Sequence, residues 1–260
     1  MEKVSDRHIT GIIPARFAST RFPGKPLALI GSKPMIRLVY EQASRALRSV
    51  YVATDDHRIY DTVRSFGGNA VMTSADHRSG TDRCAEAAGI IEKETGIAPE
   101  IIINIQGDEP FIRPEQIDLL AACFDNNNVE IATLIRKVEK DEELFNINHP
   151  KVVVALSGDA IYFSRSVIPY LRGEKPEEWA SKHTYFKHLG IYGYKKETLL
   201  RLTLLKPGPL EIAESLEQNR WLENGFRIRT AVTMWESIGI DTLADLENAR
   251  DFLNRSSIQK

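Results

Sequence analysis

The chain has 260 residues, of which 42% are hydrophobic, enough to bury a large core in one domain or in one domain with a small subdomain. Lysine and arginine total 34 and aspartate and glutamate total 36, so the formal net charge of −2 provides no general attraction for nucleic acid or an anionic membrane. Two cysteines are too few for a disulfide framework, and no stretch approaches the roughly 20 apolar residues of a membrane-spanning helix, so we expect a cytosolic protein.

Short apolar runs rich in β-branched residues recur along the chain, and amphipathic stretches separate them. This alternation is typical of a mainly parallel sheet with helices on both faces, and it predicts an α/β fold. The predicted strands lie at 9–14, 49–53, 69–72, 100–104, 131–136, 152–156, 189–194 and 228–232.

Helical spacing of apolar residues predicts four helices between these strands. They lie at 33–47, 56–66, 115–124 and 210–223. Gly67 and Gly68 stop the second helix, and Asn224 with Gly225 closes the fourth. The least regular stretch, 170–188, mixes polar, charged and aromatic residues and is predicted to be a long surface excursion or lid.

The first predicted strand runs straight into a loop that holds three cations among small residues. Arg16, Arg21 and Lys25 would supply charge-assisted donors to phosphate oxygens, and the small side chains of Ala15 and Ser19 would let backbone N–H groups approach them. The loop has neither the Walker pattern nor the dinucleotide fingerprint. A solvated basic loop is the alternative, but a position at the carboxyl end of the first strand favours a polyphosphate site.

Two aspartates are candidate metal ligands. Asp108 lies in the turn after the fourth predicted strand, where a carboxylate can hold Mg²⁺ against phosphates. An ordinary turn is an equal alternative for Asp108. Asp241 lies far along the chain, directly before a capping-box pattern at 242–245, so it could merely flank a helix start.

Seven segments carry a family resemblance: 12–26, 52–56, 76–83, 104–110, 162–165, 188–194 and 216–218. Together and in this order, they closely resemble the CMP-Kdo synthetases (3-deoxy-manno-octulosonate cytidylyltransferases), over a stretch from Ile12 to about Ala249. The departures are small. Asp82 stands where the family often has Glu, and Thr242-Leu-Ala follows Asp241 where Thr-Pro-Glu is common.

The resemblance implies a fold of the nucleotide-diphospho-sugar transferase type, a Rossmann-like, mixed and mainly parallel sheet flanked by helices. It implies a single domain over 1–260, in which about 155–205 contributes a sugar-binding and dimerisation lobe. The implied reaction is attack of the anomeric hydroxyl of Kdo on the α-phosphorus of CTP, with release of pyrophosphate, to activate Kdo for lipopolysaccharide biosynthesis. The implied cofactor is Mg²⁺, and the implied assembly is a homodimer.

The resemblance also implies a role for individual residues, carried over motif by motif. Catalysis is implied for Arg16, Lys25, Asp108 and Asp241, the last two as ligands of Mg²⁺. The implied nucleotide-binding residues are Ala15, Arg16, Ser19, Arg21, Lys25, Ser79, Gly80 and Asp108, with the turn at 79–80 facing the cytosine. The implied sugar-binding residues are Gln106, Arg165, His188, Tyr192, Glu217 and Gln218.

Plainer interpretations remain for three of the sugar-binding residues. His188 and Tyr192 could be core residues of a strand, and Glu217 could lie on a solvated helix face. Two other functions also stay open: a cytidylyltransferase for another acidic sugar such as a sialate, and a non-catalytic nucleotide-sugar binding protein. The two candidate metal ligands, Asp108 and Asp241, argue against the second of these.

Overall fold

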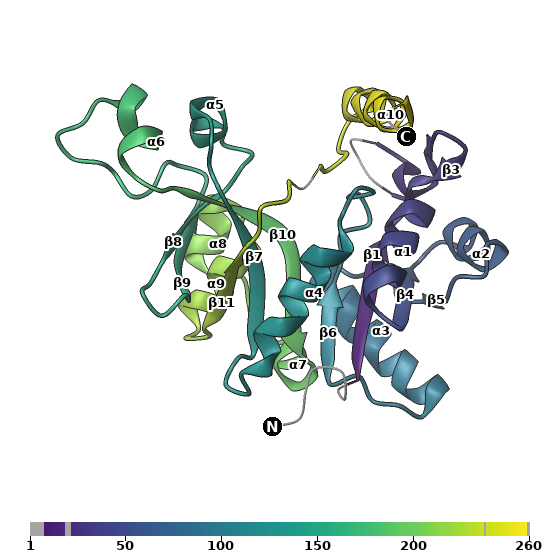
Figure 1. The fold of residues 1–260 in the computed structure, drawn as a ribbon. Helices are drawn as coiled ribbons and strands as arrows, with labels where there is room; N and C mark the ends of the chain where they lie inside the picture. The colour runs from purple at the N-terminus through teal and green to yellow at the C-terminus, as the bar shows by residue number, and fades with distance from the viewer. Residues whose placement is uncertain (1–7, 19–21, 237, 259–260) are drawn as a thin grey trace. The chain divides into compact units, whose positions relative to one another are not determined.

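The computed structural model describes residues 8–18, 22–236 and 238–258 (Figure 1). These residues divide into two compact units. The middle unit is Leu119–Glu236, and the terminal unit combines the described residues of 6–118 with those of 237–260. Helix α4 (Pro114–Ala122) runs across the boundary between them in the sequence, and the 3₁₀ turn η3 (Cys123–Asp125) follows it in the middle unit.

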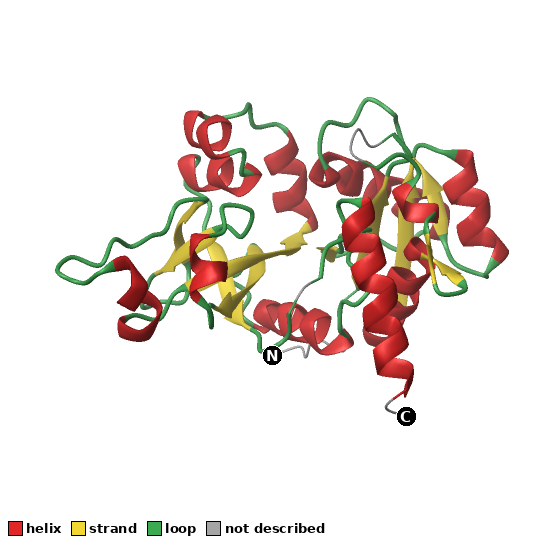
Figure 2. Cartoon of the chain, turned by 90° about the horizontal axis from the view of Figure 1, so that it is seen from above, coloured by secondary structure: helices red, strands yellow, loops and turns green. Residues whose placement is uncertain are grey.

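The terminal unit contains a four-stranded parallel arrangement in the order β6 (Ile101–Asn104), β1 (Ile9–Ala15), β4 (Ser49–Thr54) and β5 (Ala70–Met72). Seen from above, these strands lie between helices (Figure 2), which explains why they are apolar on both faces. The flanking helices are α1 (Met35–Ala46), α2 (His57–Ser65) and α3 (Gly80–Thr95). The chain fills one side of β1 with β4 and β5 and then returns to the other side with β6. Ligands of open α/β sheets bind at such a reversal, beyond the carboxyl ends of the strands.

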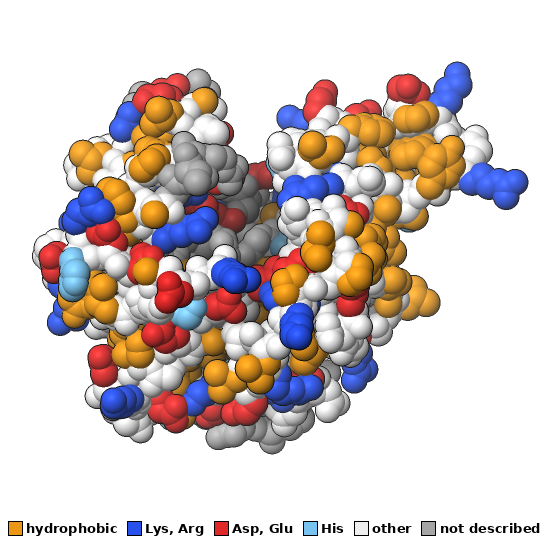
Figure 3. All heavy atoms as spheres, turned by 180° about the vertical axis from the view of Figure 1, so that it is seen from behind, with side chains coloured by type: hydrophobic (Ala, Val, Ile, Leu, Met, Phe, Trp, Pro, Cys, Tyr) orange, Lys and Arg blue, Asp and Glu red, His pale blue; other side chains and the backbone are white. Residues whose placement is uncertain are grey.

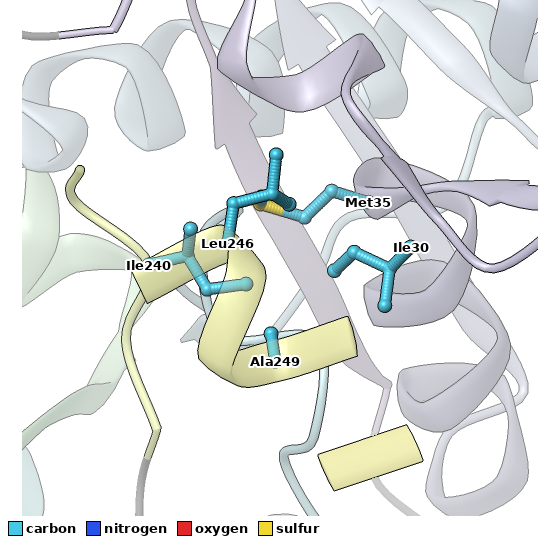
Figure 4. Packing of buried hydrophobic residues seen from close by; sticks show 5 residues of the cluster. All are labelled: Ile30, Met35, Ile240, Leu246 and Ala249. Carbon is cyan, nitrogen blue, oxygen red and sulfur yellow. The ribbon is translucent and has the colours of Figure 1, made fainter. Parts of the chain in front are cut away.

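The C-terminal helix α10 (Leu243–Ile258) completes the terminal unit. Its Leu246 and Ala249 pack with Ile240 onto Ile30 and Met35, a buried cluster shown in Figure 4. Ile30 belongs to a small hairpin formed by β2 (Leu29–Ile30) and β3 (Lys33–Pro34). The backbone N–H of Ile240 also donates to the carbonyl of Asp108 at 2.9 Å, so the segment around residue 241 lies beside the turn that follows β6.

The middle unit is a mixed sheet. Strand β7 pairs in parallel with β11 and antiparallel with β10, β10 pairs antiparallel with β8, and β8 forms a hairpin with β9. The strands are β7 (Ile131–Lys137), β8 (Lys151–Val154), β9 (Ala160–Ser164), β10 (Phe186–Lys195) and β11 (Ile228–Val232). The helices of this unit are α5 (Asp141–Phe145), α6 (Trp179–Lys182), α7 (Lys196–Thr203), α8 (Pro209–Glu214) and α9 (Glu217–Glu223).

The predicted fold class, a mixed and mainly parallel α/β sheet flanked by helices, is confirmed. Each of the eight predicted strands is present, with bounds shifted by a few residues. The sequence prediction missed the helices α3, α5 and α7, the strand β9 and the short hairpin strands β2 and β3. Among the described residues, we find no helix with the length and apolar character to cross a membrane.

Two local predictions were wrong. The single helix predicted at 210–223 is two helices, because Ser215 takes a left-handed backbone conformation (φ 51°) that ends α8. The excursion predicted at 170–188 is not irregular throughout, since it contains α6 and the start of β10. Trp179 and Tyr185 of this stretch pack with Val138 and Leu144 into a small buried cluster of their own.

Candidate functional site

A cavity of about 250 Å³ lies in the terminal unit at the carboxyl ends of β1 and β6. This is the edge at which the sequence places the basic loop and the first candidate metal ligand. Its lining residues are Pro14, Ala15, Arg16, Lys25, Pro26, His77, Arg78, Ser79, Gly80, Arg83, Gln106, Gly107, Asp108 and Asp241. The structure therefore gathers residues of four separate segments of the sequence. Ser19 and Arg21, two of the predicted nucleotide-binding residues, lie outside the described residues.

A three-residue charge cluster stands at the wall of this cavity. The ammonium of Lys25 is 2.6 Å from Oδ2 of Asp108 and 3.2 Å from Oδ1 of Asp241. Two carboxylates share one ammonium, so their formal charges leave an excess of one negative charge beside a solvent-accessible cavity. The side chains of Asp108 and Asp241 are 32% and 49% exposed, so solvent reaches both carboxylates. The cations Arg16 and Arg78 line the same cavity, so acidic and basic groups meet at this site.

The start of α10 shows how the capping box and Asp241 divide their hydrogen bonds. Thr242 and Asp245 form the capping box: Oγ1 of Thr242 accepts from the N–H of Asp245 at 3.2 Å, and Oδ2 of Asp245 accepts from the N–H of Thr242 at 2.8 Å. Asp241 contributes its backbone N–H to Asp245 at 3.0 Å, while its carboxylate bonds to Lys25. The helix start is thus capped without the carboxylate of Asp241.

Close backbone approach shapes the cavity at two glycines. A Cβ on Gly107 would lie 2.9 Å from the carbonyl oxygen of Pro14, so only glycine lets the turn after β6 pass this close to β1. Gly80 is the first residue of α3, and a Cβ there would meet the ring of Pro14 at 3.3 Å. Ser79 is the N-cap of this helix and accepts from the N–H of Asp82 at 3.1 Å. The predicted turn at 79–80 is therefore a helix N-terminus in the cavity wall.

The sequence prediction passed over three lining residues of the same motif, His77, Arg78 and Arg83. Arg83 is only 3% exposed, and its guanidinium bonds to Oγ1 of Thr73 at 2.6 Å and to the carboxylate of Asp55 at 3.1 Å. His77 lies 2.5 Å from the carboxylate of Glu86. For Arg83, the signal is the helical spacing of 79, 83 and 86, which places these positions on one face at the start of α3.

The predicted sugar-binding residues, apart from Gln106, lie in the middle unit. His188 and Tyr192 belong to β10, with ring centroids 5.2 Å apart. Burial lowers the pKa of His188 to about 3, so this imidazole is neutral at pH 7. Burial, and then the nearby carboxylate of Glu217, raise the pKa of Tyr192 well above its usual value. Gln106 lies in the terminal unit, where it lines the cavity.

Arg165 follows β9 and is tied to backbone carbonyls. Its Nε donates to Glu214 at 2.7 Å, its Nη1 to Ile147 at 3.1 Å and its Nη2 to Ser215 at 3.3 Å. A guanidinium carries five N–H donors, so these three bonds leave two for a ligand. Glu214, which the sequence prediction missed, accepts from the backbone N–H of Arg165 at 2.9 Å and from the hydroxyl of Ser164 at 2.6 Å.

Helix α9 supplies Glu217 and Gln218. The carboxylate of Glu217 pairs with Arg220 at 2.6 Å. Gln218 is 5% exposed and Tyr192 is 7% exposed, yet neither Nε2 of Gln218 nor the hydroxyl of Tyr192 has a hydrogen-bond partner among the described residues. Buried polar atoms are nearly always satisfied, so both atoms point to water or a ligand with hydroxyl groups. Tyr192 is buried, as the plainer interpretation held, but it keeps an unused polar atom, and His188 is only half-buried.

No group of three or more His, Cys, Asp or Glu side chains with the arrangement of a metal site occurs in the part of the chain that the structure describes. The pair formed by Asp108 and Asp241 is therefore the arrangement on which a metal proposal must rest. Mg²⁺ bound with a polyphosphate usually takes only one or two carboxylates from the protein, so a pair is sufficient.

Comparison with known proteins gives consistent matches over nearly the whole chain. Residues 10–232 match a family model described as cytidylyltransferase. The 3-deoxy-manno-octulosonate cytidylyltransferase of Parabacteroides distasonis is 55% identical over 247 residues, which cover 94% of this chain and 97% of that protein. The protein of the same name from Bacteroides thetaiotaomicron is 51% identical, with 95% and 98% covered. A solved structure of CMP:2-keto-3-deoxy-manno-octonic acid synthetase complexed with CTP is 42% identical, with a TM-score of 0.86 and 95% and 99% covered.

Proposed function

This chain belongs to the family of 3-deoxy-manno-octulosonate cytidylyltransferases, and on that premise we propose that it transfers CMP from CTP to Kdo with release of pyrophosphate. The CMP-Kdo formed would activate the sugar for lipopolysaccharide biosynthesis. The observation that carries the proposal is the convergence of Lys25, Asp108 and Asp241 on one cavity at the carboxyl end of the sheet. A protein that only bound a nucleotide sugar would have no need of a paired carboxylate site.

The cavity of the terminal unit is the proposed CTP site. Arg16 and Lys25 would hold the triphosphate, with Ala15 leaving room for close approach of the phosphate oxygens. The N-terminus of α3 at Ser79 and Gly80 would face the cytosine. Ser19 and Arg21 belong to this proposal through the sequence motif. Catalysis of this kind needs no covalent nucleophile, because it depends on alignment of the reactants and on neutralisation of phosphate charge.

The proposed metal ligands are Asp108 and Asp241. Both carboxylates reach one cation in this structure, the ammonium of Lys25, so they are close enough to share another. Carboxylate oxygens are the ligands that Mg²⁺ prefers, and the residues present therefore fit this ion. When bound, Mg²⁺ would supply charge neutralisation on the phosphates. Lys25 would then be available to the triphosphate.

The proposed sugar-binding residues are Gln106 in the terminal unit and five residues of the middle unit, Arg165, His188, Tyr192, Glu217 and Gln218. The two unused N–H donors of Arg165 suit the carboxylate of Kdo. The unpartnered polar atoms of Tyr192 and Gln218 suit sugar hydroxyls. His188, neutral at pH 7, would orient a hydroxyl rather than pair with a charge.

A matrix of substrates tests this function. Pyrophosphate release would be measured with each of the four nucleoside triphosphates against Kdo, a sialate and hexose phosphates, with Mg²⁺ and with EDTA. We expect turnover with CTP and Kdo and loss of activity in EDTA. Equal turnover with UTP or ATP would contradict a cytidylyltransferase. Preference for the sialate would show that Kdo is not the sugar substrate, and full activity in EDTA would show that the reaction does not need Mg²⁺.

We also propose that the protein acts in the cytoplasm as a homodimer. Both cysteines, Cys84 and Cys123, are thiols, which suits a reducing compartment.

Figure 3 shows hydrophobic side chains gathered over the middle unit, and Leu156 and Ile161 of the β8–β9 hairpin are fully and 57% exposed. Exposed apolar side chains on one hairpin support an interface. Light scattering on the purified protein should give twice the 29.3 kDa of the chain, and Ile161→Glu should halve that mass. A wild-type monomer at micromolar concentration would contradict the proposal.

A further inference from the structure

The middle unit contains a bulge that joins two of the proposed sugar-binding side chains. Leu189 pairs with Leu134, but Thr133, the next residue on β7, pairs with Tyr192. Gly190 and Ile191 are therefore extra residues on β10. Residues four apart on a regular strand are separated by about 13 Å, whereas the rings of His188 and Tyr192 are 5.2 Å apart. The bulge re-aims these side chains, as bulges beside functional sites commonly do.

Thr133 fills this bulge from the opposite strand. It is fully buried, and its Oγ1 lies 2.7 Å from the carbonyl oxygen of Ile191, 3.3 Å from that of Leu189 and 3.0 Å from Nε2 of His188. A hydroxyl has one proton to donate, and a carbonyl oxygen can only accept. If the proton pointed at His188, the 2.7 Å contact would set two oxygen lone pairs against each other with no proton between them. The hydroxyl therefore donates to Ile191.

This assignment fixes the tautomer of His188. With its proton on the carbonyl of Ile191, Oγ1 of Thr133 can only accept from His188, so Nε2 must carry the hydrogen. A neutral imidazole has a single N–H, because only the protonated ring carries two. Nδ1 is then left with a lone pair, and none of the described residues donates to it. The ring edge contact with Phe163, at 5.1 Å between centroids, limits rotation of the imidazole.

We propose that Thr133 is a positioning residue that holds His188 in its Nε2–H tautomer, so that Nδ1 accepts a hydrogen bond from a hydroxyl of the sugar acid. The inference rests on the proposed function, since it states which partner donates and which accepts in one hydrogen bond of the proposed sugar site. Thr133 itself does not touch the substrate. It acts through His188, and it also donates to the carbonyl of Ile191 in the bulge.

The tautomer is measured directly on the wild-type protein. ¹⁵N-histidine labelling and long-range ¹H–¹⁵N correlation distinguish the two neutral tautomers, and comparison with His188→Gln assigns the signal among the six histidines. We expect Nε2 to carry the proton and Nδ1 to be bare. Thr133→Val keeps the shape of the side chain and removes the hydroxyl, so the spectrum should change toward the other tautomer or a mixture. Thr133→Ser should retain the wild-type signal.

Kinetics give the second readout. We expect Thr133→Val to raise the KM for Kdo roughly tenfold, with the KM for CTP unchanged, because one neutral hydrogen bond to the sugar is lost or reversed. Thr133→Ser should restore the wild-type value. Thr198→Val is the matched control, because Thr198 is equally buried and its hydroxyl bonds to Glu130 at 3.2 Å, but it is not bonded to any proposed sugar residue.

Two results would overturn the inference: an Nδ1–H tautomer in the wild type, or a Thr133→Val protein that keeps both the tautomer and the KM for Kdo. The wild-type spectrum decides the question even if the valine variant fails to fold. A wild-type protein that does not turn over Kdo would reject the proposed function instead. The NMR spectrum would still decide which nitrogen of His188 carries the proton.

Discussion

Asp241→Asn should lower the turnover number by about a hundredfold or more, with saturating CTP and Kdo, and raise the Mg²⁺ concentration needed for half-maximal activity. The change keeps the shape of the side chain but removes a negative charge from a proposed hard-cation site. In the metal-free protein, the carboxylate is 49% exposed and bonds to Lys25 at 3.2 Å. An ion pair this exposed contributes about 0–1 kcal/mol, so the free energy of unfolding should change by no more than that.

Asp245→Asn is the matched control for this variant, because it lies four residues on and should show the opposite result. Burial alone would raise the pKa of Asp245, but hydrogen bonds from Thr242 and from the backbone N–H groups of Asp241 and Thr242 lower it. The folded state therefore favours the ionised carboxylate. The amide oxygen of Asn can accept the same hydrogen bonds without the charge, so the variant should lose up to about 1 kcal/mol of stability above pH 4 with little loss of turnover. The two variants are compared by measuring turnover as a function of Mg²⁺ concentration and by urea unfolding of the metal-free proteins. A fully active Asp241→Asn protein would leave Asp108 as the only proposed metal ligand.

Arg165→Ala should raise the KM for Kdo by at least about thirtyfold, with a much smaller effect on the KM for CTP. Loss of one partner of a hydrogen-bonded charge pair typically costs about 2–5 kcal/mol, and each 1.4 kcal/mol is tenfold in binding. The guanidinium also bonds to the carbonyls of Ile147, Glu214 and Ser215, so the variant should melt at a lower temperature than the wild type. Steady-state kinetics with each substrate varied in turn measure the split.

Arg229→Ala separates the sugar contact from a general loss of stability. Arg229 lies in the same unit, pairs with Asp159 at 3.2 Å and donates to the carbonyl of Ser157, so its removal also breaks carbonyl and carboxylate contacts. We expect a lower melting temperature and an unchanged KM for Kdo. If Arg165→Ala behaves in the same way, Arg165 is a structural residue and the carboxylate of the sugar needs another partner.

Local patterns predicted the strands well and the helices less well. The strands β1, β4 and β6 are apolar on consecutive residues because both faces of the sheet are covered, and that signal is read directly from the sequence. Helix α3 was missed because many of its buried residues are small, among them Ala85, Ala87 and Ala88, so its apolar stripe is weak. The break at Ser215 was missed because no glycine or proline marks it.

Local sequence patterns were enough to predict the mainly parallel sheet, the basic loop after the first strand and the position of Asp108 just after a strand end. Each of these follows from residues that are neighbours in the chain. The position of Asp241 beside Lys25 follows only from tertiary packing, because a helix start and a metal ligand share the same local pattern. Its role as a ligand of Mg²⁺ stays a prediction. Packing of Leu246 and Ala249 onto Ile30 and Met35 holds this segment against the turn after β6 and brings the carboxylate to Lys25.

The same limit applies to His188 and Tyr192. Their sequence spacing predicts two side chains on one face of a strand but not their contact, since a bulge depends on the register with a partner strand. The residue that fills this bulge, Thr133, lies 55 positions before His188 in the chain. A hydrogen bond between them is a property of strand pairing, which the order of residues along one segment does not contain.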